Sequence, residues 1–273
     1  MLKINNLNNI LSPLVKYPMY IFLWAFSLLI QACQGTDRSL EERTTPARAA
    51  ELASLDSTAP ATNLGADYLL GKFDPARHPD FVKVGKPYTD RSGMMLRKES
   101  FEAFKKMWEA AQKEKIVLKI ISSTRNFGQQ KNIWETKWER FAKDAPQPKD
   151  RALKILEFSS MPGSSRHHWG SDIDLNDLNN AAFETGGKYQ KVYAWLNEHA
   201  HEYGFCQPYT AGRQHGYHEE KWHWSYSPLS KPFLEEYLKN ITESDIKGFK
   251  GAELAAEIGI VQYYVGGINQ NCK

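Results

Sequence analysis

Two short stretches, SSRHHWGSDID at residues 164–174 and EEKWHW at residues 219–224, decide how this chain folds and what chemistry it can support. The first offers His167 and two aspartates, and the second offers His223 close to the carboxylate of Glu220. A hydrolytic zinc site needs three protein ligands, an open position for water and a base beside that water. The two stretches supply this set together, whereas neither supplies it alone.

The spacing within each stretch makes a geometric prediction. Polar and apolar residues alternate over residues 172–175, which predicts a strand with one solvent-facing side. Asp172 and Asp174 then share a face about 7 Å apart, too far for both to bind one ion at bonds of ~2 Å. We therefore expect one to be a ligand and the other to hold a ligand histidine or a loop amide. Glu220 and His223 are three residues apart, so they can share a site only if the chain bends or bulges between them.

The surrounding sequence predicts an α+β domain. Apolar residues at three- and four-residue spacing indicate helices, and β-branched or alternating runs indicate strands. Regular strand–helix alternation is absent from the sequence pattern, which favours a small antiparallel sheet flanked by helices. The expected helices are 96–115, 127–143, 151–158, 188–203 (ended by Gly204), 233–239 and 252–258, and the expected strands are 116–121, 172–175 and 222–226.

The first 33 residues are typical of an export signal. Lys3 and Lys16 precede an apolar run at 19–30, which is too short to span a bilayer comfortably but suits a signal-peptide core. The run ends in Ile30-Gln31-Ala32-Cys33, which resembles the lipobox of bacterial lipoproteins. That resemblance implies a lipid on Cys33, and thus a membrane-anchored protein of the cell envelope that faces the periplasm or cell wall. An ordinary signal peptide or a short anchor is the alternative.

The rest of the chain divides into a linker and one domain. Residues 34–66 are rich in small and polar residues and predict a flexible tether, and residues 67–273 fit one globular domain. Cys206 and Cys272 remain as a possible disulfide pair, with two free thiols as the alternative. The net charge is only +3 over 273 residues, which gives no support for a nucleic-acid partner.

The two stretches also resemble a known family. Ser165-x-His167-x-x-Gly170-x-Asp172-x-Asp174 and Glu220-x-Trp222-His223 are similar to the signatures Ser-x-His-x-x-Gly-x-Ala-x-Asp and Glu-x-Trp-His of VanY-type zinc D-alanyl-D-alanine carboxypeptidases. These enzymes are LAS metallopeptidases and share a fold with the hedgehog signalling domain. The resemblance implies that His167, Asp174 and His223 bind zinc and that Glu220 is the general base. Asp172 replaces the family's alanine, which leaves a second aspartate as an alternative ligand.

An upstream segment, SSTRNFGQQ at residues 122–130, resembles the family's Ser-x-x-Arg motif followed by glutamine. Arg125 follows a predicted strand, from which a guanidinium can stabilise an oxyanion or bind a substrate carboxylate; a surface charge is the alternative. The resemblance implies that Gln130 and Ser165 bind substrate. It further implies a D-alanyl-D-alanine carboxypeptidase that trims peptidoglycan stem peptides. The alternatives are an L,D- or D,D-endopeptidase of the same fold, or a non-catalytic lipoprotein that binds the cell wall.

Overall fold

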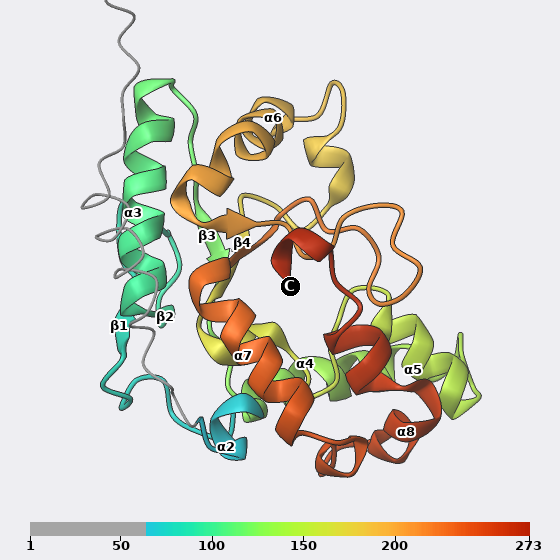
Figure 1. The fold of residues 1–273 in the computed structure, drawn as a ribbon. Coiled ribbons are helices and arrows are strands. Elements are labelled where there is room, and N and C mark those ends of the chain that lie inside the picture. Colours follow the sequence, from blue (N-terminus) through green and yellow to red (C-terminus); the bar gives the residue numbers. More distant parts are fainter. Residues whose placement is uncertain (1–63) are drawn as a thin grey trace, which may run out of the picture. The chain divides into compact units, whose positions relative to one another are not determined.

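The computed structural model describes residues 64–273, so the predicted signal, Cys33 and almost all of the predicted tether lie outside the described residues. Residues 64–273 form small antiparallel sheets packed among helices, which confirms the predicted α+β class (Figure 1). No helix in this part of the chain is long and apolar enough to cross a membrane. The elements are α2 (Ala66–Leu69), β1 (Phe81–Lys83), β2 (Met95–Arg97), α3 (Lys98–Lys113), β3 (Ile120–Ser122), α4 (Phe127–Arg140), α5 (Pro148–Leu156), β4 (Asp172–Leu175), α6 (Gln190–His199), β5 (Phe205–Cys206), β6 (His223–Tyr226), α7 (Ser227–Asn240) and α8 (Ala255–Ile258).

The central sheet has four strands in the order β3-β4-β6-β5, and each neighbouring pair is antiparallel. In the middle pair, Asp174 lies opposite His223 and Asp172 lies opposite Ser225. Side chains alternate between the two faces of a strand, so these four polar side chains share one face and Ile173 points to the other. A separate two-stranded sheet pairs β1 with β2.

All four residues of β4 are buried, so the predicted solvent-facing side of this strand is wrong. The apolar face packs against α3 and α6, in a cluster that includes Phe104, Leu196 and Trp224. The polar face is covered by a 3₁₀ turn at Arg166–Trp169, which packs on β4. A polar strand face can be buried in this way because its charged side chains find partners in the covering segment.

A second hydrophobic cluster joins α4, α5, α7 and α8, which lie below and to the right of the sheet in Figure 1. It contains Trp134 of α4, Ile155 of α5 and Tyr237 of α7, all with 1 % exposure or less. Burial of each such side chain contributes roughly 1.5–3 kcal/mol. The two clusters therefore hold the sheet and its covering turn in place from different sides.

The predicted helices are present, with ends that local chemistry explains. α4 begins at Phe127 because Asn126 and Gln129 form a capping box, in which each side chain accepts from the other residue's backbone N–H. The helix expected at 188–203 is α6 followed by a 3₁₀ turn, and Gly204 ends it at φ 79°, as predicted. The strand expected at 116–121 is shorter, because only Ile120–Ser122 pairs with β4.

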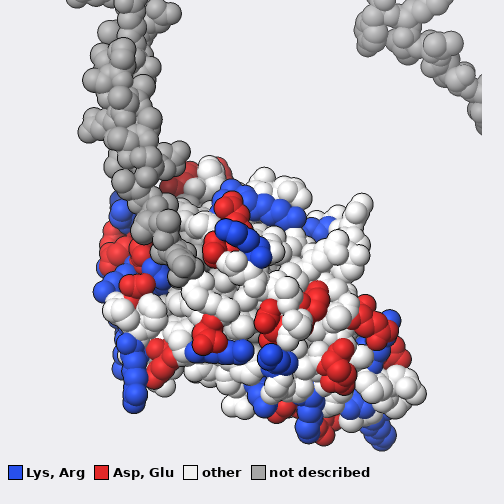
Figure 2. All heavy atoms as spheres, turned by 60° about the horizontal axis from the view of Figure 1, so that its bottom comes forward, with Lys and Arg blue, Asp and Glu red and all other residues white. Residues whose placement is uncertain are grey.

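Figure 2 shows basic and acidic side chains interspersed over the face turned toward the viewer. This distribution agrees with the small net charge of +3. Within residues 64–273, that face presents no continuous basic stripe of the kind that follows a nucleic-acid backbone.

Candidate active site

The three predicted metal ligands meet at one point. His167, Asp174 and His223 each offer one ligand atom, and these atoms lie within 4.8 Å of one another. Nε2 of His167 is 3.4 Å from Oδ2 of Asp174, and Nδ1 of His223 is 3.2 Å from Oδ1 of the same carboxylate. All three side chains are buried. Separate segments of the chain thus converge on one small polar cluster.

The backbone explains this convergence. Asp174 and His223 are direct cross-strand partners in β4 and β6. His167 comes from the 3₁₀ turn that covers the polar face, and Gly170 ends that turn in a left-handed conformation at φ 75°. A Cβ at this glycine would lie 2.4 Å from the ring of Phe81, so both the φ angle and the packing require glycine. The turn therefore returns the chain to β4 with the imidazole facing the sheet.

Each histidine is anchored by one ring nitrogen. Nδ1 of His167 lies 2.9 Å from the backbone oxygen of Ser123, so it donates there and leaves the lone pair of Nε2 free. Nε2 of His223 lies 2.9 Å from Oδ2 of Asp172, so it donates to that carboxylate and leaves Nδ1 free. The free nitrogens are the two that face Asp174. Metal-binding histidines are held in the same manner.

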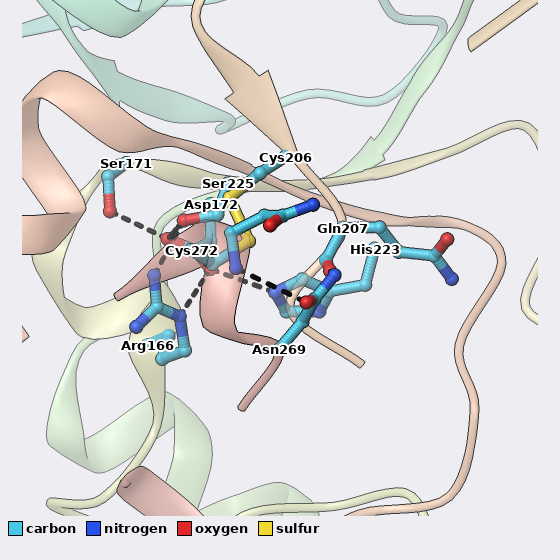
Figure 3. The surroundings of a disulfide bond; sticks show 10 residues. Arg166, Ser171, Asp172, Cys206, Gln207, His223, Ser225, Asn269 and Cys272 are labelled. Carbon is cyan, nitrogen blue, oxygen red and sulfur yellow. Dashed lines mark hydrogen bonds and ion pairs between the residues drawn. A yellow bond between two sulfur atoms is a disulfide. The ribbon is translucent and has the colours of Figure 1, made fainter. Parts of the chain in front are cut away.

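Asp172 lies behind His223, and both of its carboxylate oxygens accept hydrogen bonds (Figure 3). Its Oδ2 accepts from Nε of Arg166 at 3.0 Å, and its Oδ1 accepts from Ser171 at 2.6 Å and Ser225 at 2.9 Å. Burial alone would raise the pKa of this carboxyl, but Arg166 and His223 outweigh that effect and lower it. Asp172 therefore stays ionised and holds the ring of His223, one of the two roles expected for the second aspartate.

The ligand cluster fits a divalent cation. Burial opposes ionisation of Asp174, but His167 and His223 outweigh it and hold its pKa well below the ordinary value. Burial also opposes protonation of His223, but hydrogen bonds to surrounding carboxylates outweigh it and raise its pKa well above the ordinary value, so a cation bound at Nδ1 would take the place of a proton there. Among residues 64–273, no hydrogen-bond donor is paired with the buried Oδ1 of Asp174. Two free imidazole nitrogens and an orphaned carboxylate oxygen are a donor set that suits zinc.

Glu220 lies beside this cluster, with Oε2 3.2 Å from Nδ1 of His223. The chain turns between the two residues, since the N–H of His223 donates to the backbone oxygen of Glu220 at 3.2 Å and β6 begins only at His223. The predicted irregularity is therefore confirmed. Burial raises the pKa of Glu220, which makes it a stronger base than an exposed glutamate. The neighbouring Glu219 instead pairs with Lys221 at 3.7 Å.

Arg125 lies between β3 and α4, just before the N-cap Asn126, and reaches the same site. Its Nη1 lies 3.8 Å from Oδ2 of Asp174 and donates to Ser122 at 2.5 Å. Its Nε donates to Oε1 of Gln130 at 2.9 Å, and its backbone N–H donates to the oxygen of His167. Side-chain and backbone contacts thus fix this guanidinium next to the ligand cluster.

Two predicted substrate-binding residues lie elsewhere. Gln130 is buried, and both ends of its amide are engaged, because Oε1 accepts from Arg125 and Nε2 donates to the backbone oxygen of Ser160 at 2.8 Å. Its position behind Arg125 does not support the expected substrate contact and instead makes it a positioning residue. Ser165 is also buried and lies outside the cavity wall, and its hydroxyl has no hydrogen-bond partner within the described part of the chain.

A cavity of about 380 Å³ opens onto the ligand cluster. Tyr209 packs edge-on against His223 with ring centroids 4.7 Å apart, and burial raises its pKa, so the phenol is neutral. Sequence reasoning missed Tyr209, Tyr217 and Lys137, because single tyrosines in a loop and a lysine in a helix resemble ordinary surface residues. The cavity is lined by Arg125, Ile133, Lys137, Phe158, Ser159, Ser160, His167, Asp174, Leu178, Tyr209, Tyr217, Glu220, Trp222 and His223.

The proteins that this chain resembles in sequence are described as carboxypeptidases. The family model "VanY: D-alanyl-D-alanine carboxypeptidase" matches residues 93–229, half of the chain. A curated relative, "Putative carboxypeptidase YodJ" of Bacillus subtilis (strain 168), is 30% identical over 139 residues, which cover 48% of this chain and 46% of YodJ. The match therefore spans less than half the length of that relative.

Several solved structures are similar at low sequence identity. VanYB in complex with D-alanine-D-alanine is 21% identical, with a TM-score of 0.43, and the match covers 62% of this chain and 93% of that one. The LdcB LD-carboxypeptidase is 20% identical, with a TM-score of 0.46 and coverage of 69% and 81%. A vancomycin-resistance D,D-pentapeptidase VanY variant in complex with Zn(II) is 18% identical, with a TM-score of 0.41 and coverage of 60% and 94%.

Proposed function

Because this chain belongs to the VanY D-alanyl-D-alanine carboxypeptidase family, we propose that it is a zinc-dependent carboxypeptidase that removes the terminal D-alanine of peptidoglycan stem peptides. One observation carries the proposal. His167, Asp174 and His223 converge at the floor of a cavity, and the carboxylate of Glu220 lies 3.2 Å from the free nitrogen of His223. That is the arrangement of ligands and base that metal-assisted hydrolysis of an amide requires.

The three converging side chains would hold the ion through Nε2 of His167, Nδ1 of His223 and the carboxylate of Asp174. A zinc ion bound there supplies Lewis acidity, which lowers the pKa of a bound water towards 7 and polarises the scissile carbonyl. Asp172 and the backbone oxygen of Ser123 keep the two imidazoles in the orientation that binding needs.

Two further residues act on the reacting groups. Glu220 accepts the proton of the attacking water and then donates it to the leaving amine, and its buried position favours this proton transfer. Arg125 places its positive charge beside the cluster and stabilises the negative charge that develops on the scissile carbonyl oxygen. Gln130 and Ser122 hold Arg125 in that position.

We also propose that the protein is a lipoprotein of the cell envelope, anchored through Cys33. The lipobox-like sequence at residues 30–33 supports this location. The Cys206–Cys272 disulfide supports it as well, because such bonds persist in oxidising compartments outside the cytoplasm. A tether of about thirty residues would let the domain reach the wall from the membrane.

Incubation with defined stem peptides, with and without chelator, tests the activity by mass spectrometry. A carboxypeptidase releases free alanine from a peptide that ends in D-alanyl-D-alanine, and chelator stops the release. Cleavage of cross-linked muropeptides without free alanine would instead assign an endopeptidase. A zinc-loaded protein inert on every muropeptide would indicate a binding protein.

The Glu220→Gln variant tests the base. It should keep its zinc and lose turnover by about 10²–10⁴-fold, because the proton acceptor is gone while the ligands remain. Glu219→Gln is the matched control, since Glu219 pairs with Lys221 and should leave turnover unchanged. The His167→Ala variant should lose the metal, whereas His215→Ala, at an exposed histidine, should retain it. Stoichiometric zinc in His167→Ala would refute the ligand set.

A further inference from the structure

One lysine faces the cavity without a role in the chemistry described above. Lys137 lies on α4 one turn after Ile133, and both side chains line the cavity. Its Nζ donates to the hydroxyl of Ser159 at 2.5 Å, and Ser159 lies in the same wall. The side chain is half-buried. A flexible side chain is thus held with its charged end at the cavity surface.

This ammonium has spare hydrogen-bonding capacity. It carries three donors, of which Ser159 takes one. Within residues 64–273, no carboxylate lies within ion-pair distance of it, and Glu220, across the cavity, is the one acidic group that raises its pKa. A half-buried charge without a carboxylate partner is costly unless a ligand supplies the opposite charge.

The other cation of the cavity wall, Arg125, is already assigned to the scissile carbonyl oxygen. Arg125 donates from Nε to Gln130 and from Nη1 to Ser122, and it lies next to Asp174. Among the described residues that line the cavity, Lys137 is therefore the cation that remains for a second negative group of the substrate. Ile133 and Phe158, which also line the cavity, offer an anion no hydrogen-bond donor from their side chains.

We propose that Lys137, positioned by Ser159, binds the free α-carboxylate of the residue that leaves. This inference rests on the proposed carboxypeptidase function and deepens it, because recognition of a terminal carboxylate is what separates an enzyme that trims chain ends from one that cuts within a chain. The carboxylate lies one residue beyond the scissile carbonyl, so a cation at the wall of the same cavity suits this position.

The test compares two peptides that differ only at the end, one with a free D-alanyl-D-alanine carboxylate and one with a terminal amide. Lys137→Met should lower kcat/KM on the acid by about 10–100-fold, mainly through KM, because a charge-assisted hydrogen bond is lost. It should leave kcat/KM on the amide nearly unchanged. Lys137→Arg should restore most of the activity on the acid. Lys131→Met, on the same helix but bound to Gly248 outside the cavity, is the matched control.

Other outcomes overturn the assignment. An equal loss on acid and amide would show a structural role, and no loss on either would show that Lys137 is not used. If the loss of kcat/KM depended on a side-chain carboxylate elsewhere in the peptide and not on the terminal carboxylate, Lys137 would bind that other anion.

A binding measurement separates this proposal from the proposed function. The zinc-loaded Glu220→Gln variant, with and without Lys137→Met, is titrated with the acid and amide peptides in a calorimeter. Weaker binding of the acid alone by about 10–100-fold supports Lys137 even if the parent protein shows no turnover. Equal affinity in the two variants overturns the role of Lys137, whether or not the parent is a carboxypeptidase.

Discussion

Oδ2 of Asp172 lies 2.9 Å from Nε2 of His223, on the side of the ring that faces away from the other ligands. The carboxylate is held by Arg166 and two serine hydroxyls, so its charge is satisfied in a fully buried position. Such a contact fixes the orientation of a ligand histidine and increases its basicity. In the signature that this sequence resembles, alanine stands in place of Asp172.

Replacement of Asp172 by alanine should therefore weaken metal binding without removing a ligand. We expect zinc affinity to fall about 10–100-fold, because His223 loses its hydrogen-bond acceptor. Stability should fall by about 3–5 kcal/mol, because the buried guanidinium of Arg166 is left without its carboxylate. Zinc competition titration and urea unfolding measure the two effects.

The double variant Arg166→Met/Asp172→Ala separates these effects. Removal of both charges should recover most of the lost stability, since no unpaired charge remains buried. Zinc affinity should stay low, because His223 still lacks its acceptor. Unchanged zinc affinity in the single variant would show that Asp172 does not orient the histidine.

The position of Gln130 predicts a change in turnover and not in substrate affinity. Gln130→Ala removes the acceptor for Nε of Arg125, so the guanidinium loses a fixed position beside the cluster. We expect kcat to fall about 10–100-fold with little change in KM, as for a charge-assisted hydrogen bond of about 1.5–3 kcal/mol. Steady-state kinetics on a D-alanyl-D-alanine peptide provide the check.

Gln129→Ala is the control for that experiment, because Gln129 caps α4 at an exposed position. It should lower stability slightly and leave kcat unchanged. An increase in KM for Gln130→Ala at constant kcat would instead support direct contact with the substrate.

The family resemblance implied the ligand set, and simple spacing rules predicted how parts of it are placed. A period of two places Asp172 and Asp174 on one face of a strand, and bond lengths allow only one of them to bind the ion. Glu220 and His223 are three residues apart, so a regular strand would point them to opposite faces. The chain was therefore expected to bend between them, and it turns there. Local geometry thus predicted the shared strand face and the turn, whereas the choice of Asp174 as the ligand came from the resemblance.

The burial of β4 and the roles of two residues of α4 depend on tertiary contacts, which a local sequence pattern does not predict. β4 has the alternation of a half-exposed strand, yet both faces are buried, because the preceding turn folds back over the strand and its Arg166 neutralises the polar face. Lys137 and Gln130 are residue types that are common on any surface helix. Their roles depend on how α4 packs beside the sheet, which the sequence pattern of one helix does not determine.

The disulfide predicts a loss of stability on reduction. Cys206 of β5 bonds to Cys272 near the C-terminus, 66 residues away, and Asn269 also donates to the backbone of Pro208 and Gln207 (Figure 3). The double variant Cys206→Ser/Cys272→Ser should lose about 2–4 kcal/mol, which denaturant unfolding measures. Zinc content should be retained, because neither cysteine is a ligand. Two titratable thiols in the native protein would contradict the bond.

The charge of Lys137 predicts an alkaline limit on substrate binding. Burial lowers the pKa of this ammonium, Glu220 raises it by a smaller amount, and Arg140 and Arg125 lower it further. The group therefore loses its proton at a lower pH than an exposed lysine does. If the ammonium binds the terminal carboxylate, KM for the acid peptide should be constant below this lowered pKa and rise as the pH passes through it.

Lys137→Arg isolates the effect, because a guanidinium keeps its charge throughout the range from about pH 7 to about pH 10. KM of this variant for the acid peptide should not show the alkaline rise, and KM of the parent for the amide peptide should not show it either. Steady-state kinetics over that range, with zinc content checked at each end, measure both. An identical rise in parent and variant would place the titrating group elsewhere in the site.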